Sequence, residues 1–130
     1  MSDIELARLM LTMVYKDLTA LRGMSDQSVF ADSIFGFHVQ QTVEKVLKGW
    51  LAALDIKYPH THDINLLLNL LGKHGCEIEE YIDLVEYNIF AVQYRYESYS
   101  DTDEPIERNL ILSKLDTLLD KVSGIIANAG

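Results

Sequence analysis

Apolar residues recur three or four positions apart along most of the chain, and this spacing constrains the fold more than any other feature. It places apolar side chains on one side of an α-helix, whereas a half-buried strand needs an alternation of two. Helix breakers are sparse, since the 130 residues include seven glycines and two prolines. The sequence therefore predicts an all-α protein whose amphipathic helices bury their apolar sides against one another.

Turn residues divide this pattern into five predicted helices. They cover residues 3–21, 28–54, 63–73, 78–94 and 105 onward. The connections between them are brief, which favours antiparallel neighbours. We expect a single domain, residues 1–130, folded as an antiparallel up-and-down helical bundle of four long helices plus one short helix.

The apolar spacing also predicts which side of each helix is buried. In residues 78–94 one apolar stripe consists of Ile82, Val85, Ile89 and Val92, and beside it lie Leu84, Tyr87 and Ala91. The last helix is expected to open around Pro105, which a first turn tolerates, and to turn Leu110 inward.

The first predicted helix is apolar over more of its circumference than one neighbour requires. Beside its core stripe, a second apolar flank is formed by Leu6, Leu9 and Met13. A stripe of this width favours contact with a second subunit, so a homodimer is expected.

The chain is acidic, with 11 basic and 20 acidic residues and a net charge of −9. This balance argues against DNA as a partner, because phosphate binding depends on lysine and arginine. The acid is concentrated between residues 77 and 107, where ten acidic residues accompany Arg95 alone. This stretch is either a solvated face or a docking surface for a basic partner.

The remaining composition favours the cytoplasm. No apolar run approaches the roughly 20 residues of a membrane span, and the first residues do not read as a signal peptide. Cys76 is the single cysteine, so no intrachain disulfide can form, and it lacks a partner for thiol catalysis. No metal site is expected, since His60, His62 and Asp63 have no further ligand at a suitable spacing.

One polar stripe interrupts the second predicted helix. At 100° per residue, a single quadrant holds Gln41, Glu44, Lys45 and Lys48. The stripe is either exposed to solvent, with a weak Glu44–Lys48 ion pair, or part of a polar groove. His62 and Asp63 stand at the start of the next helix, where they either cap it or expose an anion-binding N-terminus.

The order of these residues resembles a known family. Gln41, Glu44, Lys45 and Lys48 are followed by Thr61-His62-Asp63 and then by Tyr94-Arg95-Tyr96. This arrangement resembles the HEPN domain family (higher eukaryotes and prokaryotes nucleotide-binding) over nearly the whole chain. The resemblance implies a helical bundle that often dimerises. It also implies a prokaryotic toxin–antitoxin type of pairing with a minimal nucleotidyltransferase.

The resemblance further implies a nucleotide or RNA ligand, with no other cofactor. The implied nucleotide-binding residues are Gln41, Glu44, Lys45, Lys48, Arg95 and Tyr96. Lysine and arginine would hold phosphates, and Tyr94, Tyr96 or Tyr99 would stack on a base. The alternative is that Arg95 pairs with Glu44 or Glu97 and only ties helices together.

Many members of the family are metal-independent RNases that use an arginine, four to six further residues and a histidine. Here the corresponding positions after Arg95 hold Ser100, Asp101 and Thr102, and no other arginine has the required histidine. Since general acid–base cleavage needs a proton donor near neutral pH, we expect no catalytic residues and little or no RNase activity. The alternative function is an RNase toxin with a degenerate motif.

In related pairs the partner is thought to nucleotidylate a tyrosine just after the motif arginine. Tyr96 and Tyr99 lie in the corresponding stretch of this chain. Modification of either tyrosine is therefore a hypothesis that the resemblance supplies.

Overall fold

The computed structural model describes residues 3–91 and 105–129. Within these residues the chain forms helices and no strand, which confirms the all-α class. The elements are α1 (Ile4–Gly23), α2 (Asp32–Ala53), α3 (Ile64–Lys73), the 3-10 helix η1 (Glu79–Tyr87) and α5 (Arg108–Ala129). No helix in these two ranges combines the length and the apolar character that a membrane crossing requires.

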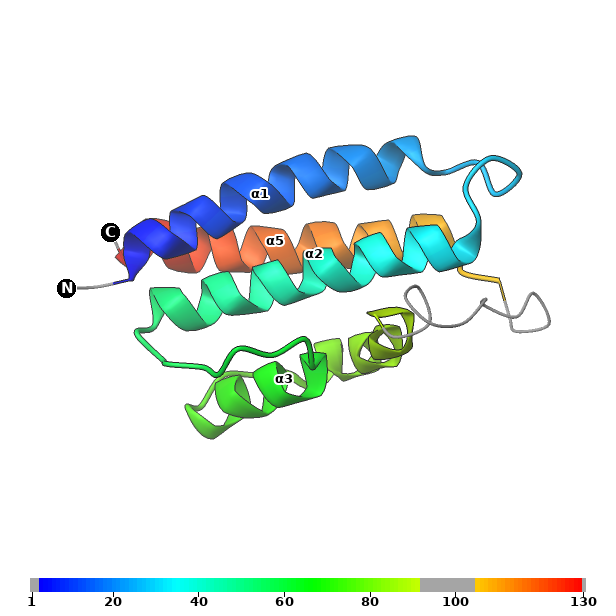
Figure 1. Cartoon of the computed structure of the whole chain (residues 1–130). Coiled ribbons are helices and arrows are strands. Elements are labelled where there is room, and N and C mark those ends of the chain that lie inside the picture. Colours follow the sequence, from blue (N-terminus) through cyan, green and yellow to red (C-terminus); the bar gives the residue numbers. More distant parts are fainter. Residues whose placement is uncertain (1–2, 92–104, 130) are drawn as a thin grey trace.

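Three long helices, α1, α2 and α5, lie side by side, and α3 and η1 pack below α2 (Figure 1). α1 runs in the direction opposite to α2 and α5, so α1 begins at the end of the bundle where α5 finishes (Figure 1). α2 is the central element, since it contacts α1, α3, η1 and α5.

The core forms where the apolar stripes meet. From α1 it takes the predicted stripe Ala7, Leu11, Val14, Leu18 and Leu21, all buried. On α2 every residue is buried or half-buried, because neighbours surround the helix. Gly36 allows one close contact, since a Cβ there would lie 2.6 Å from the Phe90 ring. α2 therefore offers no freely exposed stripe of the kind that the polar pattern permitted.

The fourth helical segment differs from its expected form. Residues 79–87 form a 3-10 helix, which has three residues per turn. The buried side chains of this helix accordingly lie three apart, at Tyr81, Leu84 and Tyr87, and Phe90 continues the spacing after the helix ends. The predicted stripe was wrong at Ile82 and Ile89, which are 51% and 49% exposed. Val85 is half-buried against the core, and Leu84 and Tyr87, which were predicted beside the stripe, are buried. Val92 lies outside the described residues.

The last helix starts later than predicted. α5 begins at Arg108, so Pro105 precedes the helix and does not occupy its first turn. Leu110 was expected inward but is 67% exposed, and the next residues, Ile111 and Leu112, are buried instead. α2 likewise begins at Asp32 and not near residue 28.

Leu6, Leu9 and Met13 form the predicted second apolar flank of α1, and they are 36%, 58% and 39% exposed. Within the described chain this flank is open to solvent. Its contact with a second subunit stays a prediction.

The Arg108 clamp joins the beginnings of α2 and α5; it consists of Met24, Phe30, Asp32, Ile106 and Arg108. The Arg108 guanidinium is 4% exposed and donates to the Met24 and Phe30 carbonyls, both at 2.5 Å. It also donates to Asp32 Oδ1 at 2.7 Å, while Asp32 Oδ2 accepts from the Ile106 amide at 3.0 Å. A buried arginine is tolerable because charged and carbonyl oxygens replace its water.

Candidate functional site

A buried carboxylate organises the polar stripe of α2. Glu44 is only 3% exposed, and it accepts hydrogen bonds from four side chains that define the Glu44 cluster with it. The donors are Gln40, Gln41 (3.4 Å), Lys48 (3.2 Å) and His62 (3.0 Å). The Glu44–Lys48 ion pair expected from the sequence is present, but it lies in the protein interior and not in solvent. A carboxylate buried at this depth is stable only because each lone pair has a partner.

The segment before α3 holds His62 against this carboxylate. Asp63 caps α3 by accepting from the Asn65 amide at 2.9 Å, and Thr61 Oγ1 accepts from the Asp63 amide at 3.1 Å. Asn88 fixes the same point from the other side. It donates to Asp63 Oδ1 at 2.8 Å and accepts from the Ile64 amide at 3.0 Å. The helix N-terminus expected as an anion site is thus satisfied by its own cap and by Asn88.

His62 links the interior to the surface. Its Nδ1 lies 3.0 Å from Glu44 Oε1, yet 52% of its side chain is exposed. Gln40 donates to the His62 carbonyl at 3.1 Å, which fixes the backbone as well. Since a carboxylate only accepts hydrogen bonds, Nδ1 carries the proton, and Nε2 of the neutral ring is an acceptor. When protonated, the ring becomes a donor at Nε2, which suits a phosphate oxygen.

The two lysines of the stripe have different partners. Lys48 Nζ binds Glu44 Oε1, whereas Lys45 Nζ binds Asp17 Oδ2 of α1 at 2.7 Å. Their side chains are 13% and 25% exposed, so neither is a freely solvated cation. The structure therefore brings Gln41, Glu44 and Lys48 together with His62, and it turns Lys45 towards α1.

Other predicted site residues lie outside the described residues, namely Tyr94, Arg95, Tyr96 and Tyr99. Nothing in the described part of the chain gathers three or more His, Cys, Asp or Glu side chains in a position to hold a metal ion. Burial raises the pKa of Cys76, which disfavours the reactive thiolate.

Sequence reasoning missed three residues of the site. Gln40 is fully buried between Glu44 and His62, and its signal was its spacing of four residues from Glu44. Asn88 and Asp17 carried no comparable signal, because their partners are 25 and 28 residues away in sequence. Only the packing of η1 and α1 on α2 places them there.

Comparison with known proteins supports the family that the residue order indicates. The family described as HEPN domain matches residues 8–120 of this chain. No curated protein and no solved structure matches it significantly. The match includes α2, the His62 segment, η1 and most of α5. The chain therefore belongs to the HEPN domain family.

Proposed function

We propose that this HEPN protein binds a nucleotide or RNA at the Glu44 cluster and acts as a homodimer. The observation that carries the proposal is the Glu44–His62 pair, in which a buried carboxylate orients a half-exposed imidazole. A side chain fixed in this way binds a ligand at a lower entropic cost than a free one. Lys48 adds a cation to the same carboxylate, and the family supports a nucleotide as the ligand.

Charge balance defines how such a ligand would bind. Lys45 and Lys48 are each neutralised by an acidic neighbour, so the cluster does not attract phosphate through a surplus of positive charge. A phosphate oxygen would instead accept from protonated His62 and compete with Asp17 for Lys45. The remaining charge is expected from Arg95, which the family resemblance assigns to this site.

Titration calorimetry with ATP, GTP and a short RNA tests the proposal. Binding should be at least about tenfold weaker in His62→Ala and in Lys48→Met, which corresponds to about 1.4 kcal/mol. Lys73→Met is the matched control, since it removes an exposed lysine at the end of α3 that has no contact with the cluster. Equal affinity in all four proteins would contradict a ligand site at the Glu44 cluster, and Arg95→Ala tests the residue carried by resemblance.

We also propose the biological setting that the resemblance implies. The protein is the HEPN half of a toxin–antitoxin-like pair in a prokaryotic cytoplasm, and its partner is a nucleotidyltransferase. The exposed flank of Leu6, Leu9 and Met13 supports a homodimer through α1. Light scattering should report a dimer that Leu9→Glu converts to a monomer. Intact mass after co-expression with the partner should reveal a nucleotide adduct, absent in the double variant Tyr96→Phe and Tyr99→Phe.

One observation favours the alternative, a degenerate RNase. Glu44 and His62 form a carboxylate–imidazole pair of the kind that accepts a proton from a hydroxyl group. If this pair replaces the absent arginine–histidine motif, the pure protein should cleave labelled RNA in the presence of a chelator. That activity should disappear in His62→Gln. Binding without turnover would leave the nucleotide-binding function alone.

A further inference from the structure

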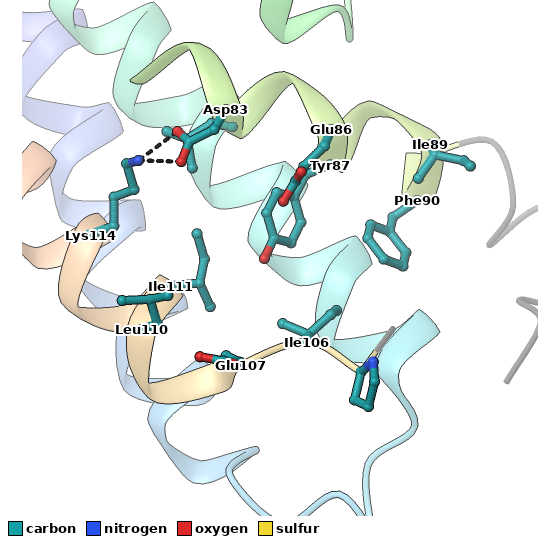
Figure 2. A pocket seen from close by; sticks show the side chains of 12 residues that line it. Asp83, Glu86, Tyr87, Ile89, Phe90, Ile106, Glu107, Leu110, Ile111 and Lys114 are labelled. Atoms are coloured by element: carbon teal, nitrogen blue, oxygen red, sulfur yellow. Dashed lines mark hydrogen bonds and ion pairs between the residues drawn. The ribbon is translucent and has the colours of Figure 1, made fainter. Parts of the chain in front are cut away.

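A groove separates η1 from the start of α5 (Figure 2), and none of the residues that line it belongs to the Glu44 cluster. Its volume is about 810 Å³. That volume is in the range of cavities that accept a small molecule or several side chains of a protein segment. The η1–α5 groove is lined by Asp83, Leu84, Glu86, Tyr87, Ile89, Phe90, Pro105, Ile106, Glu107, Leu110, Ile111 and Lys114.

The groove is apolar at its base and at part of its rim. Leu84 and Tyr87 of η1 are buried and line its base together with Phe90, which follows η1. Ile106 and Ile111 face Tyr87 and Phe90 across the groove (Figure 2). At the rim, Ile89 is 49% exposed and Leu110 is 67% exposed. Sequence periodicity had placed both of these side chains in the core. Large apolar side chains left in solvent beside a cavity are typical of an interaction surface.

The charges around the groove are unequal. Lys114 is its single cation among the described lining residues, and both carboxylate oxygens of Asp83 bind its Nζ at 2.5 Å. Glu86 and Glu107 lie on opposite walls, are exposed, and form no ion pair within the described part of the chain (Figure 2). The groove thus combines apolar contact area with two exposed carboxylates that have no cationic partner among the described residues.

We propose that the η1–α5 groove is the docking site for a protein partner whose segment carries apolar side chains flanked by lysine or arginine. An amphipathic helix lays its apolar side into such a groove, and its basic residues would reach Glu86 and Glu107. This inference rests on the proposed function in one respect, namely that the protein works with a protein partner. It names the surface and the chemistry of that partner.

The negative charge of the groove disfavours two other occupants, a nucleotide and a second copy of this chain. A nucleotide would bring further negative charge to Glu86 and Glu107. A second copy of this chain would do the same, since the chain carries 20 acidic and 11 basic residues. The proposed homodimer contact uses a different surface, the exposed apolar flank of α1 formed by Leu6, Leu9 and Met13. The acidic residues of η1 would in addition steer a basic partner towards this side; they are Glu79, Glu80, Asp83 and Glu86.

Amide NMR spectra of the full-length ¹⁵N-labelled protein test the groove. The probe is a short amphipathic peptide with leucines at helical spacing and lysines between them, and its control has glutamate in place of each lysine. The lysine peptide should shift amide signals in residues 83–90 and 106–114 and leave those around His62 unchanged. The glutamate peptide should shift neither set.

Matched variants separate the groove from general attraction to an acidic protein. The double variant Ile89→Ser and Leu110→Ser should weaken peptide binding by about tenfold or more, whereas Leu54→Ser, at an exposed leucine after α2 that does not line the groove, should not. Glu86→Gln with Glu107→Gln should weaken it about threefold and flatten its salt dependence. Asp120→Asn, an exposed acid elsewhere on α5, should leave the affinity unchanged.

Three results would overturn the proposal. These are no binding of the lysine peptide, signal changes spread over the whole acidic surface, or equal affinities in the groove and control variants. Titration of ATP, GTP and RNA into the same labelled protein tests ligand binding at the Glu44 cluster separately, through the amide signals around His62. A negative result for peptide binding at the groove can therefore be told apart from a negative result for nucleotide binding at the Glu44 cluster.

Discussion

Two buried charges, Arg108 and Glu44, play different parts in this molecule. They are exposed to similar extents, 4% and 3%, and each has several hydrogen-bond partners. The partners of Arg108 are two backbone carbonyls and Asp32, whose side chain is 16% exposed. Glu44 instead holds His62, which is 52% exposed. A buried charge surrounded by buried partners fastens the fold, whereas one that orients an exposed partner can act on a ligand.

The largest expected effect is on stability and belongs to the Arg108 clamp. Arg108→Ala should lower the free energy of unfolding by about 3–5 kcal/mol, because it leaves Asp32 and two backbone carbonyls without their hydrogen-bond donor. Urea denaturation measures this loss. Arg22→Ala, which removes an exposed ion pair with Asp116, should cost about 1 kcal/mol or less. Similar losses in the two variants would remove the distinction between a clamp and a surface pair.

Glu44→Ala should have the next largest effect and should separate stability from binding. It leaves Lys48 and His62 without their acceptor, so we expect a loss of about 1–3 kcal/mol. Glu44→Gln should cost less stability, yet it should weaken nucleotide binding through the loss of His62 orientation. If stability falls in both variants while nucleotide affinity stays at the wild-type value, Glu44 is a second clamp and the comparison with Arg108 fails.

His62→Ala should affect stability less than either variant, by about 0.5–1 kcal/mol, because half of the side chain is in solvent. Its effect on nucleotide binding should nevertheless match that of Glu44→Gln. Parallel denaturation and calorimetry provide both values. A stability loss as large as that of Glu44→Ala, without an effect on affinity, would assign His62 to the interior network alone.

The smallest expected effect on stability concerns Asp26, a charged residue that is exposed, in contrast to Arg108 and Glu44. Its side chain accepts from Ser28 Oγ at 2.6 Å and from the Ser28 amide at 2.9 Å. These bonds hold the pKa of Asp26 below its ordinary value of 3.8, the side-chain bond contributing most. A lowered folded-state pKa gives stability that is present above the unfolded value and lost as the pH falls through the folded one. The small stability difference between wild type and Asp26→Asn should therefore shrink on acidification below about pH 4.

The sequence predicted the helices and their apolar stripes better than it predicted the contacts between elements that are distant in the chain. The stripe from Ala7 to Leu21 followed directly from α-helical spacing, since one neighbouring surface buries it. The same reasoning failed at Ile82 of η1, because residues spaced by three fit a 3-10 helix as well as an α-helix. It also left the Glu44 stripe undecided. Whether a polar residue of α2 meets solvent depends on elements far along the chain, such as the segment that carries His62 and Asn88.

The 3-10 form of η1 affects how far this segment extends along α2. Tyr81 packs against Trp50 of α2, with ring centroids 6.2 Å apart, and Phe90 packs against Gly36. The two α2 positions are separated by 14 residues, or about 21 Å at 1.5 Å per residue. The six residue steps from Tyr81 to Tyr87 would span about 9 Å as an α-helix but about 12 Å as a 3-10 helix. The longer rise per residue of η1 helps the nine residue steps from Tyr81 to Phe90 reach two points of the central helix that are fourteen residues apart.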